Sequence, residues 1–283
     1  MTQIDQFESV FRAAAHDAFE YEAVVFPRVL FVTDTDADLS QAFVRQTLNY
    51  AANLKNAAIE SVHGKEFRST DELLEKVTAH NPDLICTYRN LHSRAWKFRH
   101  SLGEHLDVLL QRTAAPVLVM PHPEAGFAHA AVLQGTNVVM VMTDQLANNH
   151  ALVNKAVSLT APGGALYLTH IEDKAVFERY MDAISKIPSI DTDNAREQIA
   201  EQLLKDSITY ISSCQEVLET QGLTLTVHPL VSFGHHLTEY RQAVESHAVN
   251  LLVMNTKDNE QLAMHGLAYP LAVELRQLPL LML

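Results

Sequence analysis

The run Pro116-Val117-Leu118-Val119-Met120 begins thirteen residues after Gly103, and the run Pro279-Leu280-Leu281-Met282-Leu283 begins thirteen residues after Gly266. Each run is short, continuous and apolar, which is typical of a strand buried on both faces of a parallel sheet. Because the same spacing occurs in the middle of the chain and at its end, we infer that one structural unit is repeated.

Two further stretches match in the same order. Val29-Leu30-Phe31-Val32-Thr33-Asp34 recurs as Val139-Met140-Val141-Met142-Thr143-Asp144, and residues 82–87 correspond to residues 249–254. Three matched strands in one order predict a duplicated domain. The predicted division has four parts: an N-terminal helical segment at 1–26, a first, shortened domain at 27–123, a linker at 124–135 and a second, full-length domain at 136–283.

The composition is that of a folded protein with room for two cores. The chain has 283 residues, of which 47% are hydrophobic and 19% are charged, and this balance argues against disorder. The net charge of −13 disfavours nucleic acid and anionic membranes as partners. No apolar run reaches the ~18 residues of a membrane helix, and Cys86 and Cys214 form no CxxC motif. We therefore expect reduced thiols and a cytoplasmic location.

Strand-like and helical segments alternate along the whole chain. Strands are predicted at 28–33, 57–62, 83–87, 116–120, 137–144, 165–170, 223–231, 250–255 and 279–283. Helices are predicted at 5–20, 39–54, 69–80, 102–113, 146–160, 174–220 with a break near Pro188, 236–247 and 267–277. This alternation predicts an α/β fold made of two doubly wound, Rossmann-like parallel sheets.

The two halves differ in length. The second half has one more strand–helix unit, so we expect segment 57–63 to be the only strand on the corresponding side of the first half. The helix predicted at 5–20, with Ile4, Phe7, Val10, Phe11 and Ala14 on one face, would cover the surface that the missing helix leaves open. Asp38 or Ser40 is the expected N-cap of the helix at 39–54.

The ordered set of motifs resembles the universal stress protein family, over roughly residues 27–121 and 136–283. It consists of Val-Thr-Asp closing the first strand, Pro-Asp-Leu-Ile opening a later strand, and Gly thirteen steps before Pro-Val-Leu-Val-Met. The resemblance implies a tandem of two adenine-nucleotide-hydrolase-like domains. It also implies that they pack as a pseudo-symmetric pair through the strands at 116–120 and 279–283, with a homodimer as a further expectation.

Members of this family that bind ATP carry Gly, two residues, Gly, about nine residues, and then Gly-Ser or Gly-Thr. Glycines let backbone amides approach phosphate oxygens. The first-half positions are Tyr88, Leu91 and Gly103 followed by Glu104, and the second-half positions are Asn255, Asp258 and Gly266 followed by Leu267. The resemblance therefore implies the fold and, with most of the glycines replaced, a degenerate ATP motif.

The family aspartate after the first strand is retained in both halves, as Asp34 and Asp144. The resemblance implies that it would contact the nucleoside. The leading interpretation is a stress-response regulatory or binding module without turnover and without a required cofactor. The alternative is an ATP- or AMP-binding protein, with slow hydrolysis, that uses a divergent first-half site of Asp34, Arg89, Arg94 and Gly103.

The stretch 84–103 contains no acid, four basic residues (Arg89, Arg94, Lys97 and Arg99) and interleaved aromatic residues. In a doubly wound fold this loop lies beyond the carboxyl ends of the strands, where ligands bind. Three hypotheses remain: the arginines bind a small phosphorylated, anionic ligand, the loop docks an acidic partner (a protein or an RNA end), or its aromatic residues pack back onto the domain.

Other candidate sites have simpler interpretations. Asp34, Asp36 and Asp38 could bind a divalent cation, but turn and capping roles explain them as well. The histidines of the second half lack the spacing of a zinc site, so surface and cap roles are favoured; they are His228, His235, His236 and His247. No nucleophile–base motif is visible, so we do not expect an enzyme.

Overall fold

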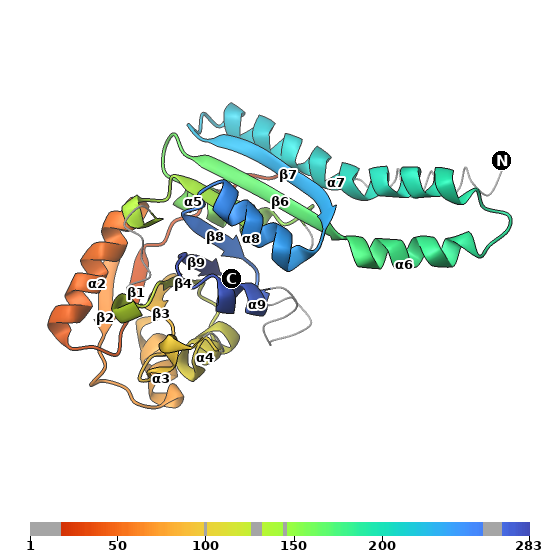
Figure 1. Ribbon diagram of the computed structural model, residues 1–283. Helices are drawn as coiled ribbons and strands as arrows, with labels where there is room; N and C mark the ends of the chain where they lie inside the picture. The colour runs from red at the N-terminus through yellow and green to blue at the C-terminus, as the bar shows by residue number, and fades with distance from the viewer. Residues whose placement is uncertain (1–17, 99–100, 126–131, 144–145, 257–267) are drawn as a thin grey trace.

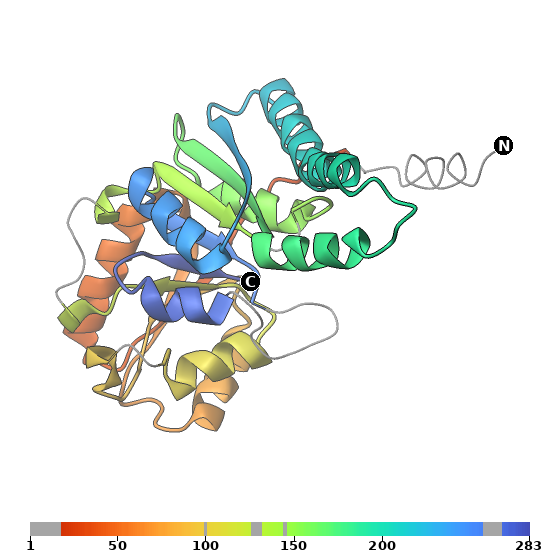
Figure 2. The ribbon, with the colours of Figure 1, turned by 45° about the vertical axis from the view of Figure 1, so that its right-hand side comes forward.

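One nine-stranded sheet forms the centre of the molecule, with helices on both of its faces (Figures 1 and 2). The computed structural model describes residues 18–98, 101–125, 132–143, 146–256 and 268–283. The α/β fold class predicted from the sequence is confirmed, since all neighbouring strands but one pair are parallel.

The strands are short in the middle of the sheet and long at one edge. They are β1 Arg28–Val32, β2 Ala58–Val62, β3 Leu84–Tyr88, β4 Val117–Met120, β5 Val138–Met142, β6 Ala165–Asp173, β7 Thr226–Gly234, β8 Leu251–Met254 and β9 Leu280–Met282. The helices are α2 Ala37–Tyr50, α3 Thr70–His80, α4 Glu104–Arg112, α5 His150–Leu159, α6 Lys174–Ser185, α7 Thr192–Thr220, α8 His236–Ser246 and α9 Ala268–Glu274.

The strand order is β2-β1-β3-β4-β9-β8-β5-β6-β7, and the only antiparallel neighbours among the described strands are β4 and β9. In that pair Val117 faces Met282, Leu118 faces Leu281, and Val119 faces Leu280. The expected contact edges at 116–120 and 279–283 therefore do pair. Outward from this seam the two halves have the same strand order, while the domain boundaries themselves stay a prediction.

The outer edges of the sheet differ as expected. The first half ends in β2 alone, whereas the second half ends in β6 and β7. Both of these strands are nine residues long, so β6 continues past the predicted end at 170. Pro229 lies within β7, which is an edge strand. On an edge strand every second N–H faces away from the sheet, and a proline at such a position removes no hydrogen bond between strands.

The N-cap of α2 is Asp36, not Asp38 or Ser40. The Asp36 side chain accepts a hydrogen bond from the backbone N–H of Leu39 at 3.0 Å. Asp38 instead lies in the first turn of the helix, and Ser40 is buried. A short acid one residue before the first turn satisfies an otherwise unpaired amide, so α2 begins two residues earlier than the sequence predicted.

The predicted helix at 5–20 lies almost entirely outside the described residues. Its last three positions, 18–20, are described and are not helical. The Phe19 ring meets the edge of the Tyr210 ring of α7 at 6.2 Å, and the Phe19 N–H donates to Ser213 Oγ at 3.0 Å. This segment therefore contacts helix α7 of the second half, and the expectation that it covers the first half is wrong for the described part.

Helix α6 and the first half of α7 project beyond the sheet as a two-helix arm (Figure 1). Asp173 and Asp191 cap the two helices, with side chains that accept from first-turn backbone N–H groups. Within the arm, Arg196 of α7 donates to Glu178 of α6 at 2.9 Å. The predicted break near Pro188 is confirmed, since it falls between the two helices.

Candidate functional site

The carboxyl ends of β1 and β3 bring Asp34 against the loop that follows β3, because these strands are parallel neighbours. The Tyr88 hydroxyl donates to Asp34 Oδ1 at 2.5 Å. The backbone N–H of His92 donates to Asp34 Oδ2 at 2.7 Å. Both carboxylate oxygens are thus bound by the loop, at the edge of the sheet where α/β proteins bind ligands.

The Tyr88 side chain is buried, and this keeps its hydroxyl beside Asp34. Only 1% of its surface is exposed. Burial raises the pKa of the Tyr88 phenol above its usual range, and the neighbouring Asp34 carboxylate raises it further. The hydroxyl therefore stays protonated at neutral pH and remains a donor to Asp34.

Above this pair the aromatic residues of the loop form a stack. Trp96 lies on His122, which follows β4, with ring centroids 4.8 Å apart and an interplanar angle of 19°. The His122 ring meets Tyr88 edge-on at 4.9 Å, and Lys97 Nζ lies 5.4 Å from the Trp96 ring. Because burial lowers the pKa of His122, this stack is mainly neutral at neutral pH. Tyr88 and Trp96 therefore pack onto the domain, as one of the three hypotheses expects, whereas Phe98 is exposed.

A second ring cluster includes His92, whose backbone N–H binds Asp34. Phe67 is 4.7 Å from His92 and 5.5 Å from His105, and the two histidine rings are 5.4 Å apart. His105 Nε2 lies 3.1 Å from the carbonyl oxygen of Arg68. Burial lowers the pKa of His92, and its neighbours His105 and Arg68 add to that effect against the opposing charge of Asp34. Phe67 and His105 are buried, so the rings of this cluster are closely packed.

Arg89 faces the seam between the halves and not the Asp34 carboxylate. It is 4% exposed. Its guanidinium donates to the carbonyl oxygens of Leu275 at 3.0 Å and Val273 at 3.5 Å, at the end of α9. Burial, together with Arg276, lowers the pKa of Arg89 to about 9, so it is charged at neutral pH. A buried cation at the carboxyl end of a helix is favourable, and this geometry gives Arg89 a structural role.

The other candidates of the first half separate. Arg94 is exposed at the start of the single turn Ala95–Lys97. Gly103 precedes α4 with a φ of 96°, and a Cβ there would lie 2.6 Å from Asn90 Cα, so close packing explains this glycine. Asp144 and Gly266 lie outside the described residues, and their roles stay predictions.

The three aspartates after β1 do not converge. Asp34 is bound by Tyr88 and His92, Asp36 caps α2, and Asp38 lies within the first turn of that helix. In the part of the chain that the structure describes, no three His, Cys, Asp or Glu side chains form a group suited to a metal. Turn and capping roles therefore account for this cluster.

The histidines of the second half contact aromatic and backbone groups. Tyr167 lies between His228 at 4.8 Å and His247 at 4.4 Å. His236 Nε2 lies 2.6 Å from the carbonyl oxygen of Ile171, and His235 is the N-cap residue of α8. These are the surface and cap roles that the sequence favours.

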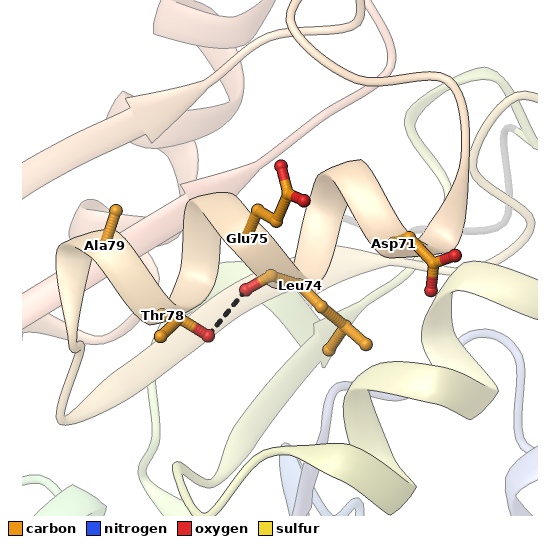
Figure 3. Close-up of a pocket in the computed structure, with 5 residues that line it drawn as sticks. All are labelled: Asp71, Leu74, Glu75, Thr78 and Ala79. Atoms are coloured by element: carbon orange, nitrogen blue, oxygen red, sulfur yellow. Dashed lines mark hydrogen bonds between the residues drawn. The ribbon is translucent and has the colours of Figure 1, made fainter.

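A shallow hollow of about 640 Å³ lies along α3, lined by Asp71, Leu74, Glu75, Thr78 and Ala79 (Figure 3). All five residues come from one helix, and the Thr78 hydroxyl donates to the Leu74 carbonyl oxygen within that helix. This open helix face carries no convergent set of polar groups, so we do not treat it as the functional site.

Comparison with solved structures gives the fold a context. The chain matches a protein of unknown function from Pseudomonas aeruginosa PAO1 with a TM-score of 0.52 and 11% identity, over 92% of each chain. It matches a protein from Pseudomonas aeruginosa UCBPP-PA14, described as a candidate universal stress protein, with a TM-score of 0.52 and 11% identity, over 92% of this chain and 93% of that one. The chain shares the fold of these proteins.

A universal stress protein from Archaeoglobus fulgidus DSM 4304 is also similar, with a TM-score of 0.49 and 14% identity, over 90% of this chain and 85% of that one. No family model and no curated protein matches the sequence. The two Pseudomonas structures, at 11% identity, show a similar fold and nothing further.

Sequence reasoning placed Tyr88 at the first glycine position but did not identify its partner. It also did not identify His122 or Arg276. The Arg276 guanidinium donates to the carbonyl oxygen of Trp96 at 3.1 Å. These contacts join residues that are far apart in sequence. The one available signal was the bulk of Tyr88 at a position where the family pattern has glycine.

Proposed function

We propose that the chain is a universal-stress-type regulatory or binding module that works without catalytic turnover. The observation that carries this proposal is the Asp34 carboxylate, which is bound on both oxygens by Tyr88 and His92. An aspartate that is used within the protein in this way is not available to a nucleoside. We infer that the first-half site is closed by its own side chains.

The phosphate end of such a site is also unfavourable. Leu91 stands at the second glycine position and is buried, so a side chain occupies the path that backbone amides need. Glu104 and Asp107 lie in the first turn of α4. Two acids at a helix N-terminus already complement its partial positive charge and oppose the binding of a second anion.

The partner that fits best is an acidic protein surface. Arg94, Lys97 and Phe98 are exposed on the loop after β3, and Phe98 is 62% exposed. A cationic patch with one apolar side chain suits an acidic partner surface, which gains both charge complementarity and apolar burial. The alternative is that Arg94 binds a small anionic ligand, such as the nucleotides ATP or AMP.

The remaining properties follow from the same arrangement. Strands β4 and β9 pair within one chain. We propose that the two halves of the chain form the contact that two single-domain chains would form in a homodimer. Cys86 and Cys214 are both free and buried, which suits a reducing compartment such as the cytoplasm. Of the described helices, none combines the length and apolar character needed to cross a membrane.

Thermal unfolding with and without ATP, AMP and magnesium tests the proposal. A ligand at a hundred times its Kd stabilises by ~2.7 kcal/mol, which corresponds to about 5–10 °C for a protein of this size. We expect no shift with any of these ligands. A magnesium-dependent rise that is retained in Arg112→Ala, a control at the far end of α4, but lost in Arg94→Ala would establish a nucleotide site instead.

A further inference from the structure

The loop at 89–98 has an unfavourable backbone conformation at two positions. Asn90 has a φ of 58° and His92 a φ of 57°, in the left-handed region that residues other than glycine seldom adopt. Such conformations persist where surrounding contacts hold them, and they are concentrated at sites that change shape. The contact of the His92 N–H with Asp34 therefore depends on the groups that hold His92 in place.

The side chains that hold His92 are Phe67 and His105. Phe67 meets the His92 ring edge-on, and the His105 ring is 5.4 Å away. Phe67 is 1% exposed and His105 is 7% exposed, so both belong to the folded body of the domain. We call Phe67, His92 and His105 the histidine cluster, and its contacts fasten the loop at 89–98 to the rest of the protein.

The docked position of His92 suits a neutral ring. Its Nε2 atom is buried and has no hydrogen-bond partner among the described residues. In a neutral imidazole one nitrogen carries no proton, whereas in the charged form both nitrogens are donors. A buried, charged donor without an acceptor is costly. The docked loop therefore tolerates neutral His92 and opposes its protonation.

The charged and titratable groups that act on His92 come from three elements. They are Asp34 after β1, Arg68 before α3 and His105 of α4. Burial lowers the pKa of His92. Arg68 and His105 act in the same direction, while Asp34 and the Phe67 backbone act in the opposite one. A histidine in solvent has a pKa of about 6.5, so the released loop binds a proton more readily than the docked loop.

A further histidine contacts the same loop. His122 stacks on Trp96, and burial lowers its pKa, whereas Asp34 and Glu124 both oppose that effect. Its Nδ1 accepts a hydrogen bond from the backbone N–H of Glu124 at 3.2 Å. We therefore expect His122 to contribute in the same direction as His92 but to a smaller extent.

We propose that the histidine cluster is a pH-sensitive switch, in which protonation of His92 releases the loop at 89–98 from Asp34. Above about pH 6.5 the ring is neutral in both states, and the loop stays docked. As the pH falls below this value, the released loop takes up a proton that the docked loop resists. The equilibrium then moves toward release by up to about tenfold for each pH unit.

This inference deepens the proposed function, on which it rests, because it names a condition that opens the closed first-half site. Release removes one of the two donors to the Asp34 carboxylate. It also frees Arg94 and Lys97, which the docked loop presents at its surface. A fixed arrangement binds a partner with a smaller loss of conformational entropy. The docked loop is therefore the form that suits an acidic partner, and acidification weakens that binding.

Hydrogen exchange of the wild-type chain tests the switch without any ligand. Peptides that cover 89–98 are compared at pH 7.5 and pH 5.5, and each rate is divided by the intrinsic rate at that pH to give a protection factor. The protection of this loop should fall several-fold, and by at most about a hundredfold over the two units, while that of β1 and β8 stays constant. Equal protection of the loop at both pH values, or an equal fall in the strands, would overturn the proposal.

Two variants assign the effect to His92. His92→Gln cannot gain a proton, so the fall in protection should be less than half that of the wild type on a logarithmic scale. His228→Gln is the matched control, because His228 lies in β7 against Tyr167, and it should keep the wild-type fall. A fall of half the wild-type size or more in His92→Gln, or its loss in His228→Gln, would refute the role of His92.

A titration of the wild-type ring does not depend on any substitution. The carbon-bound ring protons of His92, followed by nuclear magnetic resonance, should titrate with a midpoint below the value of about 6.5 for a solvated histidine. A midpoint at or above that value would overturn the proposal, because the docked loop would then favour the proton.

None of these experiments contains a nucleotide or a partner. Failure of the switch would leave the closed site and the binding module as proposed. A thermal shift with ATP or AMP at pH 7.5 would instead overturn the proposed function, and it would leave the exchange and titration results unchanged.

Discussion

The Leu281→Ala substitution tests whether the nine strands unfold as one unit. Leu281 lies in β9 at the seam, faces Leu118 across the antiparallel pair and Val253 on the other side, and is 0% exposed. Buried Leu→Ala substitutions cost about 2.7–5 kcal/mol, more where the surroundings cannot collapse into the cavity. Because strands on both sides hold this position, we expect a loss of at least about 3 kcal/mol.

Two spectroscopic signals report on different parts of the sheet. Trp96 is the only tryptophan, and its stack with His122 places it in the first half. Far-ultraviolet circular dichroism reports on all helices and strands. The free energy of unfolding should depend on urea by about 3 kcal/mol per molar. The urea midpoints from Trp96 fluorescence and from circular dichroism should therefore both fall by about 1 M, although Leu281 belongs to the second half. The exposed control Ile208→Ala should change stability by less than about 0.5 kcal/mol.

Coincident shifts are the expected result, because the buried apolar residues form one continuous cluster across the seam and cooperative unfolding then involves both halves. The reasoning would be refuted if the Trp96 midpoint stayed at its wild-type value while the dichroism separated into two transitions. The halves would then be independent units that only touch at the β4–β9 pair.

Two further predictions concern buried charges. Burial raises the pKa of Asp107 to about 6, so the native state holds this proton more tightly than the unfolded state does, and wild-type stability falls as the pH rises from about 4 through 6. Asp107→Asn should therefore raise the free energy of unfolding by about 1 kcal/mol at pH 7.5, after allowance for partial exposure, and by almost nothing at pH 3.5. An equal gain at both pH values in urea unfolding would contradict this prediction. Arg89→Met should lower the free energy of unfolding by about 2 kcal/mol, because the carbonyl oxygens of Leu275 and Val273 lose a charged donor. Arg89→Lys should recover part of the loss in the same melts, and equal stability of all three proteins would show that the contact contributes nothing.

Much of the fold could be predicted from local patterns. The strands were located because the continuous apolar runs at 117–120 and 251–254 are buried at every position. The start of α3 was located because Ser69 and Glu72 form a capping box. Boundaries were less accurate where the cap depended on one of several neighbouring acids, as at Asp36.

The candidate site was less accessible to sequence reasoning. The sequence marked Asp34 and the basic-aromatic loop as neighbours, and this holds in the structure. It offered Arg89 and Arg94 as equivalent ligands, yet one is buried on α9 and the other is exposed. Which of two nearby arginines faces solvent depends on the carbonyl oxygens of Leu275 and Val273, more than 180 residues away, and no local pattern encodes that.

The sequence by itself determined the strand and helix types and the α/β class, while the pairing of the last strands of the two halves was an expectation from the family resemblance. It could do so because burial selects continuous apolar runs and because caps and turns act over a few residues. Only the tertiary structure decided the state of the site. Asp34 and Tyr88 are 54 residues apart, and their hydrogen bond exists because parallel pairing of β1 and β3 brings their ends together in a buried place, where a protonated phenol and a carboxylate are each other's nearest polar partner.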